Sequence, residues 1–214
     1  MSLIVNEIFN SIQGESLCAG LPCTFIRLTG CNLRCSYCDT AYAYEEGATL
    51  TITDVIDKVS DYECPLVEIT GGEPLIQSET PLLITNLIEK GYEVLLETNG
   101  TIDLSRINER CIKIVDIKCP GSGESGKNCL DNLDRLNTKD QIKFVITDRE
   151  DYEFAKYIIK HIPAWFLREN MLLSPVSGKM AFSDLAKWIL EDKLIARFHI
   201  QLHKIIWPNI DKGV

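Results

Sequence analysis

Short apolar strands alternate with helical segments along most of this chain, and no other feature of the sequence constrains its fold as strongly. Strands that alternate with helices form a mostly parallel sheet with right-handed connections. We therefore predict an α/β protein whose functional groups gather at the carboxyl ends of the strands, as in barrels and open α/β sheets. Thr53 and Ser183 are suitable N-caps for the first and last helices. The pattern predicts strands over residues 22–29, 66–70, 93–97, 112–117, 142–147, 172–173 and 198–202, and helices over 53–60, 82–90, 150–161 and 184–191.

Length and charge narrow the class of protein further. The chain has 214 residues, enough to bury roughly 70% of the surface that the unfolded chain exposes, and we predict a single domain over residues 1–214. Its 31 acidic and 22 basic residues give a net charge of −9, which argues against nucleic acid and against a polybasic membrane surface. The first residues lack a leader pattern, and no apolar run approaches the ~18 residues of a spanning helix. We expect a cytoplasmic protein with no membrane partner.

Three of the nine cysteines crowd into one short segment, where Cys31, Cys35 and Cys38 have the spacing C-x3-C-x2-C. In a reducing compartment, clustered cysteines are more often metal ligands or catalytic groups than disulfide partners. A structural zinc ion usually takes four protein ligands, so a zinc site would need Cys18 or Cys23 as the fourth. A [4Fe–4S] cluster held by three cysteines would keep one iron free for an outside ligand. The spacing alone leaves both sites open.

The spacing C-x3-C-x2-C, with Tyr37 just before the third cysteine, resembles the signature of the radical S-adenosylmethionine superfamily. Gly71-Gly72-Glu73-Pro74, directly after a predicted strand, resembles the motif with which that superfamily holds the amino group of S-adenosylmethionine, although alone it would be only a turn. The resemblance implies a partial, trimmed parallel β/α barrel, a three-cysteine [4Fe–4S] cluster, and a one-electron cleavage that releases a 5′-deoxyadenosyl radical. The implied contacts of S-adenosylmethionine are Tyr37, Cys38, Asp39, Gly72, Asp116, Ile117, Lys118 and Ser174, of which Lys118 could instead be a solvated cation.

The flanks of the cysteine segment narrow the resemblance to one family. Residues 9–16 (FNSIQGES), residues 24–33 (TFIRLTGCNL) and the step Cys38-Asp39-Thr40 resemble the 7-carboxy-7-deazaguanine synthases, which act in the biosynthesis of queuosine and other 7-deazapurines. Residues 201–204 (QLHK) and 213–214 resemble that family as well, so the likeness covers nearly the whole chain. Ser16 departs from the family's usual glycine and could alter the turn after Glu15.

This family resemblance implies an activity and a set of substrate contacts. The implied reaction converts 6-carboxy-5,6,7,8-tetrahydropterin to 7-carboxy-7-deazaguanine with loss of ammonia, and it requires Mg²⁺. Arg27 lies on the strand before the cysteines, and its guanidinium suits the substrate carboxylate. Thr40 would offer a hydroxyl oxygen to Mg²⁺, a hard cation that prefers oxygen. Arg27 and Glu15 are the predicted catalytic residues. The N-terminal segment 1–21 carries a substrate-binding motif, and the predicted substrate contacts are Ile12, Gln13, Gly14, Arg27, Thr70 and Val214.

Two other functions fit parts of the sequence. A small activating enzyme that installs a glycyl radical on a partner protein shares the size and cysteine spacing but needs neither residues 11–15 (SIQGE) nor the terminus 212–214 (KGV). A zinc-stabilised interaction module fits the cysteines but predicts no cleavage of S-adenosylmethionine. For the favoured function we expect a flavodoxin-type electron donor and a homodimer. At strand ends, residues 97–99 could face a ligand or form a turn, and His203 could donate a proton or pack.

Overall fold

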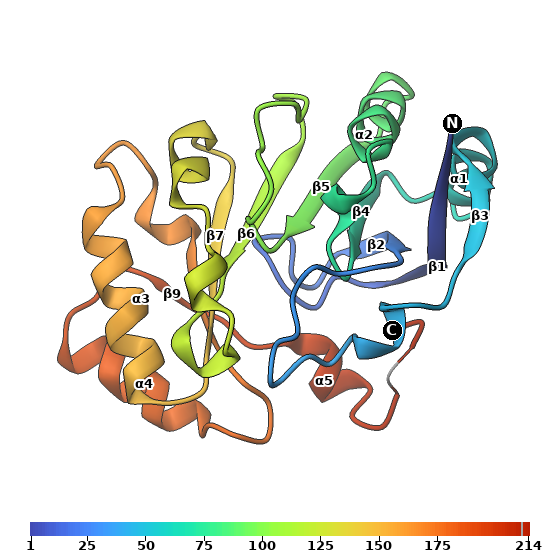
Figure 1. Ribbon diagram of the computed structural model, residues 1–214. Helices are drawn as coiled ribbons and strands as arrows, with labels where there is room; N and C mark the ends of the chain where they lie inside the picture. The colour runs from blue at the N-terminus through green and yellow to red at the C-terminus, as the bar shows by residue number, and fades with distance from the viewer. Residues whose placement is uncertain (211) are drawn as a thin grey trace.

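A computed structural model describes residues 1–210 and 212–214 of the chain (Figure 1). Within these residues the helices are α1 Ile52–Ser60, α2 Thr80–Glu89, α3 Arg149–His161, α4 Phe182–Glu191 and α5 Leu202–Ile206. The strands are β1 Ser2–Ile12, β2 Pro22–Leu28, β3 Ala48–Thr51, β4 Leu66–Gly71, β5 Glu93–Thr98, β6 Ile112–Ile117, β7 Gln141–Ile146, β8 Met171–Pro175 and β9 Arg197–Phe198. None of the helices in this part of the chain is long and apolar enough to cross a bilayer.

All of these strands join one sheet in the order β3-β1-β2-β4-β5-β6-β7-β8-β9. Each pair from β2 to β9 is parallel, whereas β1 pairs antiparallel with both β2 and β3. The sheet curves strongly in Figure 1, and β3 and β9 form its two free ends, so the barrel is not closed. The predicted α/β architecture, a partial parallel barrel, is confirmed.

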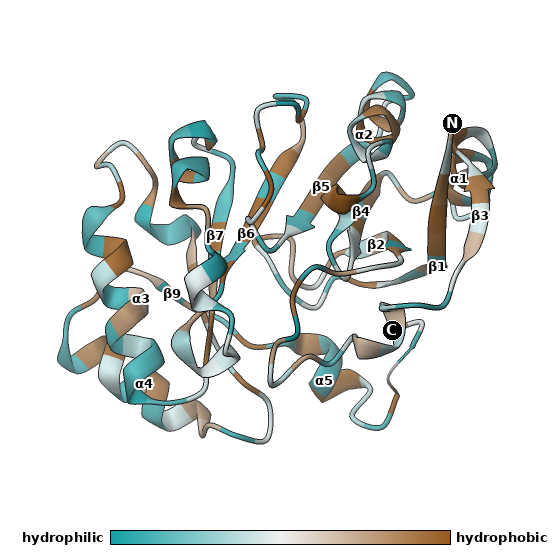
Figure 2. Ribbon diagram, in the orientation of Figure 1, coloured by the Kyte–Doolittle hydropathy of each residue, from teal (hydrophilic) through white to brown (hydrophobic). Residues whose placement is uncertain are grey.

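Side chains alternate between the two faces of each strand, and this alternation separates core from site. In β4, Val67 and Ile69 belong to the main apolar core that the strands share with α1 to α4, whereas Glu68 and Thr70 line a cavity on the other face. Lys143 of β7 lines the same cavity. Figure 2 shows apolar stretches along β1, β4 and β5, and polar residues both in loops and on the helices α3 and α4. Glu68, Thr70 and Lys143 therefore lie on the inner face of the barrel.

The structure corrects both predicted helix caps. Thr51, not Thr53, caps α1: its hydroxyl accepts from the Asp54 N–H, and the Asp54 carboxylate accepts from the Thr51 N–H. This reciprocal pair satisfies two donors at the helix start, which a single threonine inside the first turn does not do. The prediction of Ser183 as a cap is also wrong, because α4 begins after Ala181 and has no side-chain cap.

Two strands are missing from the sequence-based prediction, and one predicted strand is too long. The alternation of β1 breaks at an irregularity between Val5 and Glu7, and β3 is a four-residue, mostly exposed strand. Both pair antiparallel at one end of the sheet, so neither has the buried apolar run of a central parallel strand. At the other end, the predicted strand 198–202 reduces to β9, and α5 begins at Leu202.

Candidate active site

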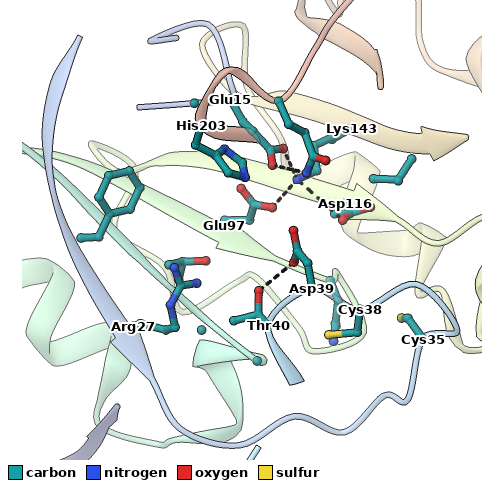
Figure 3. A pocket seen from close by; sticks show the side chains of 18 of the residues that line it. Glu15, Arg27, Cys35, Cys38, Asp39, Thr40, Glu97, Asp116, Lys143 and His203 are labelled. Carbon is teal, nitrogen blue, oxygen red and sulfur yellow. Dashed lines mark hydrogen bonds and ion pairs between the residues drawn. The ribbon is translucent and has the colours of Figure 1, made fainter. Parts of the chain in front are cut away.

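A cavity lies at the carboxyl ends of the parallel strands (Figure 3). It is lined by all of the residues predicted for the cluster, magnesium, catalysis and substrate, namely Cys31, Cys35, Cys38, Thr40, Glu15, Arg27, Ile12, Gln13, Gly14, Thr70 and Val214. Of the predicted contacts of S-adenosylmethionine, the lining includes Tyr37, Cys38, Asp39, Gly72, Asp116 and Lys118 but not Ile117 or Ser174. The side chain of Ile117 packs in the main core instead, so only its backbone could face a ligand.

The three cysteines of the motif lie on the loop after β2. Burial raises the pKa of the Cys31 and Cys35 thiols, whereas Cys38 is exposed. The loop is fixed through its backbone, since the Ser36 N–H donates to the Ser122 carbonyl at 3.0 Å. The thiols are therefore presented by a positioned loop, and binding iron there must displace their protons.

A four-ligand zinc site does not fit the same loop. Cys18 and Cys23, the proposed fourth ligands, belong instead to a small apolar cluster that includes Phe25 and Leu66. The donor set fits a cluster with three thiolate ligands better than it fits structural zinc.

The Gly-Gly-Glu-Pro turn after β4 is held rigidly against the neighbouring strand. The Glu73 carboxylate is fully buried and accepts from the Leu75 N–H at 3.0 Å, the Asn99 N–H at 2.7 Å and the Thr98 hydroxyl at 2.8 Å. This carboxylate is therefore occupied and is not the group that would bind an ammonium ion. Backbone groups of the turn remain for that role, and Thr98 and Asn99 support the turn.

Gly72 has no room for a side chain. A Cβ at this position would lie 2.2 Å from the Gly30 carbonyl oxygen and 2.6 Å from the Cys31 Cβ. The turn therefore packs directly against the start of the cysteine loop. This close approach explains why the motif needs glycine here.

Gly72→Ala should destabilise the protein by about 1–3 kcal/mol, because backbone on both sides of the contact must shift. The shift separates the turn from the cysteine loop, so we also expect weaker binding of S-adenosylmethionine to the holoenzyme. Thermal unfolding and equilibrium dialysis measure the two effects. Gly126→Ala is the control, since no atom lies within 4 Å of its Cβ position. Wild-type stability and affinity in Gly72→Ala would contradict the assignment.

Unpaired buried polar atoms test whether the cavity fits S-adenosylmethionine. Within the described chain, the buried side-chain atoms without a hydrogen-bond partner include Tyr37 Oη and Asp116 Oδ1, and both residues line the cavity. Buried polar groups normally have partners, so such atoms suggest that a ligand completes them. Lys118 is not a solvated cation, because its ammonium pairs with Asp116 Oδ2 at 2.7 Å. The residues present fit the cofactor.

A buried ammonium group organises the acidic side chains of the inner face (Figure 3). Lys143 Nζ lies 2.6 Å from Glu15 Oε2 and 3.8 Å from Asp116 Oδ2, and it also donates to Glu97. Burial opposes charge on these groups, yet Lys143 lowers the pKa of Glu15 and the carboxylates raise the pKa of Lys143. Glu15 also accepts from Gln201 at 2.8 Å, so its carboxylate ties the β1–β2 loop both to β7 and to the segment before α5.

Glu68 and Lys143 are absent from the site predicted from sequence. Each is the one charged residue in a buried strand segment, LVEIT and QIKFV, and this is the signal that could have found them. The signal is ambiguous, because Lys113 lies in a similar segment and pairs with Asp140 at 2.8 Å, outside this cavity. Lys113 shares its strand face with Val115 and Ile117, which pack in the main core, and the sequence does not state which face of a strand borders the cavity.

Arg27 is positioned by three neighbours. Its Nε donates to Glu7 Oε1 at 2.7 Å, and its guanidinium carbon lies 5.6 Å from the centre of the Phe9 ring and 5.7 Å from that of Tyr42. The side chain is only 13% exposed. Because Glu7 engages Nε, the two Nη groups present an edge of the kind that binds carboxylates in a two-pronged way.

The segment after β9 closes one side of the cavity. The Leu202 N–H donates to the Gly14 carbonyl at 2.9 Å, and a Cβ on Gly14 would lie 2.2 Å from His203 Nδ1. Lys204 pairs with Asp39 at 3.0 Å across the opening. Burial lowers the pKa of His203, so a neutral, packed imidazole forms this wall.

The comparisons with known proteins agree with this site. The Radical SAM superfamily model matches residues 25–118. A 7-carboxy-7-deazaguanine synthase of Koribacter versatilis is 42% identical, with 98% of this chain and 99% of that protein covered, and one of Chlorobaculum tepidum is 43% identical, with 99% and 97% covered. The crystal structure of QueE from Escherichia coli shares the fold at a TM-score of 0.76, 24% identity and 95% coverage of both chains. The chain thus belongs to the 7-carboxy-7-deazaguanine synthase family of the radical S-adenosylmethionine superfamily.

Proposed function

We propose that this protein converts 6-carboxy-5,6,7,8-tetrahydropterin to 7-carboxy-7-deazaguanine with loss of ammonia, as a step toward queuosine and other 7-deazapurines. The observation that carries the proposal is that one cavity holds both the three motif thiols and an arginine prepared for a carboxylate. Relatives that match over nearly their whole length carry the name of this activity, which favours it over a glycyl-radical activating enzyme.

The chain is a radical S-adenosylmethionine enzyme, a class that uses a [4Fe–4S] cluster and S-adenosylmethionine. Cys31, Cys35 and Cys38 would hold the cluster, while Tyr37, Asp116 and the backbone near residue 72 would hold S-adenosylmethionine. Once bound, the two cofactors would supply a 5′-deoxyadenosyl radical that removes hydrogen from C6 of the substrate. The protein's own residues bind, orient and shield the reacting groups.

The substrate would lie between Arg27 and the acidic inner face. The Arg27 guanidinium would bind its carboxylate, and residues 12–14, Thr70 and Val214 would contact its edges, since all of them line the cavity. Glu15 would hold the Lys143 network in place through its ion pair. The wall formed by His203 and Gly14 would exclude water and keep side reactions from the reacting carbon.

Thr40 is the proposed magnesium contact. The Thr40 hydroxyl donates to Asp39 Oδ1 at 2.9 Å, and although burial opposes ionisation, Lys204 lowers the pKa of Asp39. The carboxylate is therefore charged at neutral pH beside the hydroxyl. Mg²⁺ keeps several waters and takes few protein oxygens, so one hydroxyl together with a substrate carboxylate suits it.

Thr40→Ala should raise the Mg²⁺ concentration needed for half-maximal turnover by about tenfold, the loss expected when one contact to a charged group is removed. Turnover measured across a magnesium titration provides the test. Thr49→Ala, at an exposed position on β3, is the matched control and should behave as wild type. An unchanged magnesium requirement in Thr40→Ala would exclude Thr40 as a ligand.

The protein partners follow from the same proposal. A flavodoxin-type donor would reduce the cluster, and the exposed position of Cys38 leaves that side of the site approachable. We also propose that the protein is a homodimer and is cytoplasmic. Size-exclusion chromatography with light scattering tests the homodimer, and reduction of the holoenzyme by purified flavodoxin tests the electron donor.

Anaerobic turnover tests the function directly. Purified protein reconstituted with iron and sulfide should convert the carboxypterin in the presence of S-adenosylmethionine, Mg²⁺ and dithionite, with the product identified by ultraviolet absorbance and mass. Release of 5′-deoxyadenosine only in the presence of a protein partner would indicate an activating enzyme. A colourless protein carrying one zinc ion would indicate an interaction module. Either result would overturn the proposal.

A further inference from the structure

The inner faces of β2 and β4 present two successive layers of side chains to the cavity. Arg27 pairs in register with Thr70, and Phe25 pairs with Glu68, two residues deeper along both strands. All four residues line the cavity. A strand rises about 3.3 Å per residue, so the layers are about 7 Å apart. A flat two-ring heterocycle bound by Arg27 at one end would reach the layer of Glu68 with its other end.

Glu68 is a buried carboxyl group with a free acceptor oxygen. Its residue exposure is 3%, and it accepts a hydrogen bond from Gln13 Nε2 through Oε2. The Gln13 amide cannot turn around, because its Oε1 accepts from the Glu15 N–H at 3.0 Å, and a backbone N–H can only donate. Within the described residues, Glu68 Oε1 has no hydrogen-bond partner.

No cation neutralises Glu68 as Lys143 neutralises its neighbours. Among the described residues, the ion pairs of Lys143 go to Glu15, Glu97 and Asp116, and none reaches Glu68. Burial and the nearby Glu97 carboxylate accordingly raise the pKa of Glu68 to about 8. A buried carboxyl group in this state costs folding free energy unless a ligand completes it.

We propose that Glu68 is the specificity residue for the pyrimidine end of the substrate, where its carboxyl group accepts a hydrogen bond from the exocyclic 2-amino group. This inference rests on the proposed function. It concerns the pyrimidine ring of the substrate, which Arg27 at the carboxylate end does not contact. Phe25, which stacks on Phe9 at 5.0 Å, supplies an apolar surface in the same layer. An ionised carboxylate would accept from the amino group and the adjacent ring N–H, and a protonated one would accept from the amino group and donate to the ring nitrogen.

The test compares two ligands that differ at this one position. Pterin-6-carboxylate carries the 2-amino group, and lumazine-6-carboxylate carries an oxygen in its place. Isothermal titration of each into the anaerobic holoenzyme with S-adenosylmethionine and Mg²⁺ gives two dissociation constants. We expect wild type to prefer the pterin by at least about tenfold. In Glu68→Leu the preference should fall to less than about threefold, with the lumazine bound as tightly as by wild type or more tightly.

Two variants separate recognition from folding. Glu68→Gln keeps an acceptor oxygen of the same size and should retain part of the preference. Glu93→Gln, exposed at the start of the adjacent strand β5, should leave both constants unchanged. A Glu68→Leu protein that keeps the full preference, or that loses affinity for both ligands equally, would overturn the assignment. If wild type binds neither carboxylate, the proposed function fails instead.

Discussion

Cys35→Ala should remove the [4Fe–4S] signal and lower the rate of S-adenosylmethionine cleavage on the order of 1,000-fold or more, equivalent to about 4 kcal/mol. Cys35 is one of only three thiols on the loop, and the nearest alternative cysteines by sequence lie in a separate apolar cluster. Those cysteines are therefore not placed to replace Cys35. Visible absorption and electron paramagnetic resonance after dithionite treatment measure the cluster, and 5′-deoxyadenosine release measures cleavage.

The matched control for this loss is Cys129→Ala. Cys129 is a half-buried free cysteine that precedes a 3-10 turn and does not line the cavity. The variant should keep the absorption, the resonance signal and the cleavage rate of wild type. A paramagnetic signal of full intensity in Cys35→Ala, still shifted by added S-adenosylmethionine, would show that the loop cysteines are not the ligands.

Arg27→Met should raise the KM for the carboxypterin by about 100-fold or more, because a two-pronged hydrogen bond to a charged carboxylate is lost. The same change leaves Glu7 without its guanidinium partner, which should lower the free energy of unfolding by about 1–3 kcal/mol. Arg27→Lys keeps the charge but not the fork and should recover only part of the affinity. Steady-state kinetics and chemical denaturation measure the two effects.

A binding comparison separates recognition by Arg27 from its structural pairing with Glu7. Unsubstituted pterin lacks the carboxylate that Arg27 is expected to bind, so its affinity should change little in Arg27→Met. Pterin-6-carboxylate should lose most of its advantage over pterin. Equal weakening of both ligands would contradict the assignment, since it would mean that the guanidinium acts only through Glu7 and the two aromatic rings around it.

The central parallel strands could be predicted from sequence because burial on both faces requires a nearly continuous run of apolar residues. β6 matches its predicted range, β4 and β5 each extend one residue further, and β7 begins and ends one residue earlier than predicted. The strands at the antiparallel end have no such apolar run. β1 is interrupted by polar residues and a register shift, and β3 is exposed. The α1 cap was displaced because a reciprocal pair between Thr51 and Asp54 outweighs a favourable residue two positions later.

The site residues also fall into two groups: those in contiguous motifs, which the sequence predicts, and those brought together from distant segments, which it does not. The cysteine loop and the glycine turn are contiguous motifs, so sequence placed them together in one cavity. Glu7 holds Arg27 across an antiparallel pair, and Lys143 meets Glu15 from 128 residues away. Those contacts depend on strand register and on the path of the β1–β2 loop. A single sequence states neither.

The anchoring of Glu73 has a thermodynamic consequence for ligand capture. Three donors from two chain segments already hold this carboxylate. The backbone beside it is therefore ordered before any cofactor binds. Ordering a mobile loop would subtract from affinity at the moment of association. Here the conformational entropy of the turn is lost during folding. The free energy of the contacts between the turn and the ligand is therefore not reduced by ordering the turn.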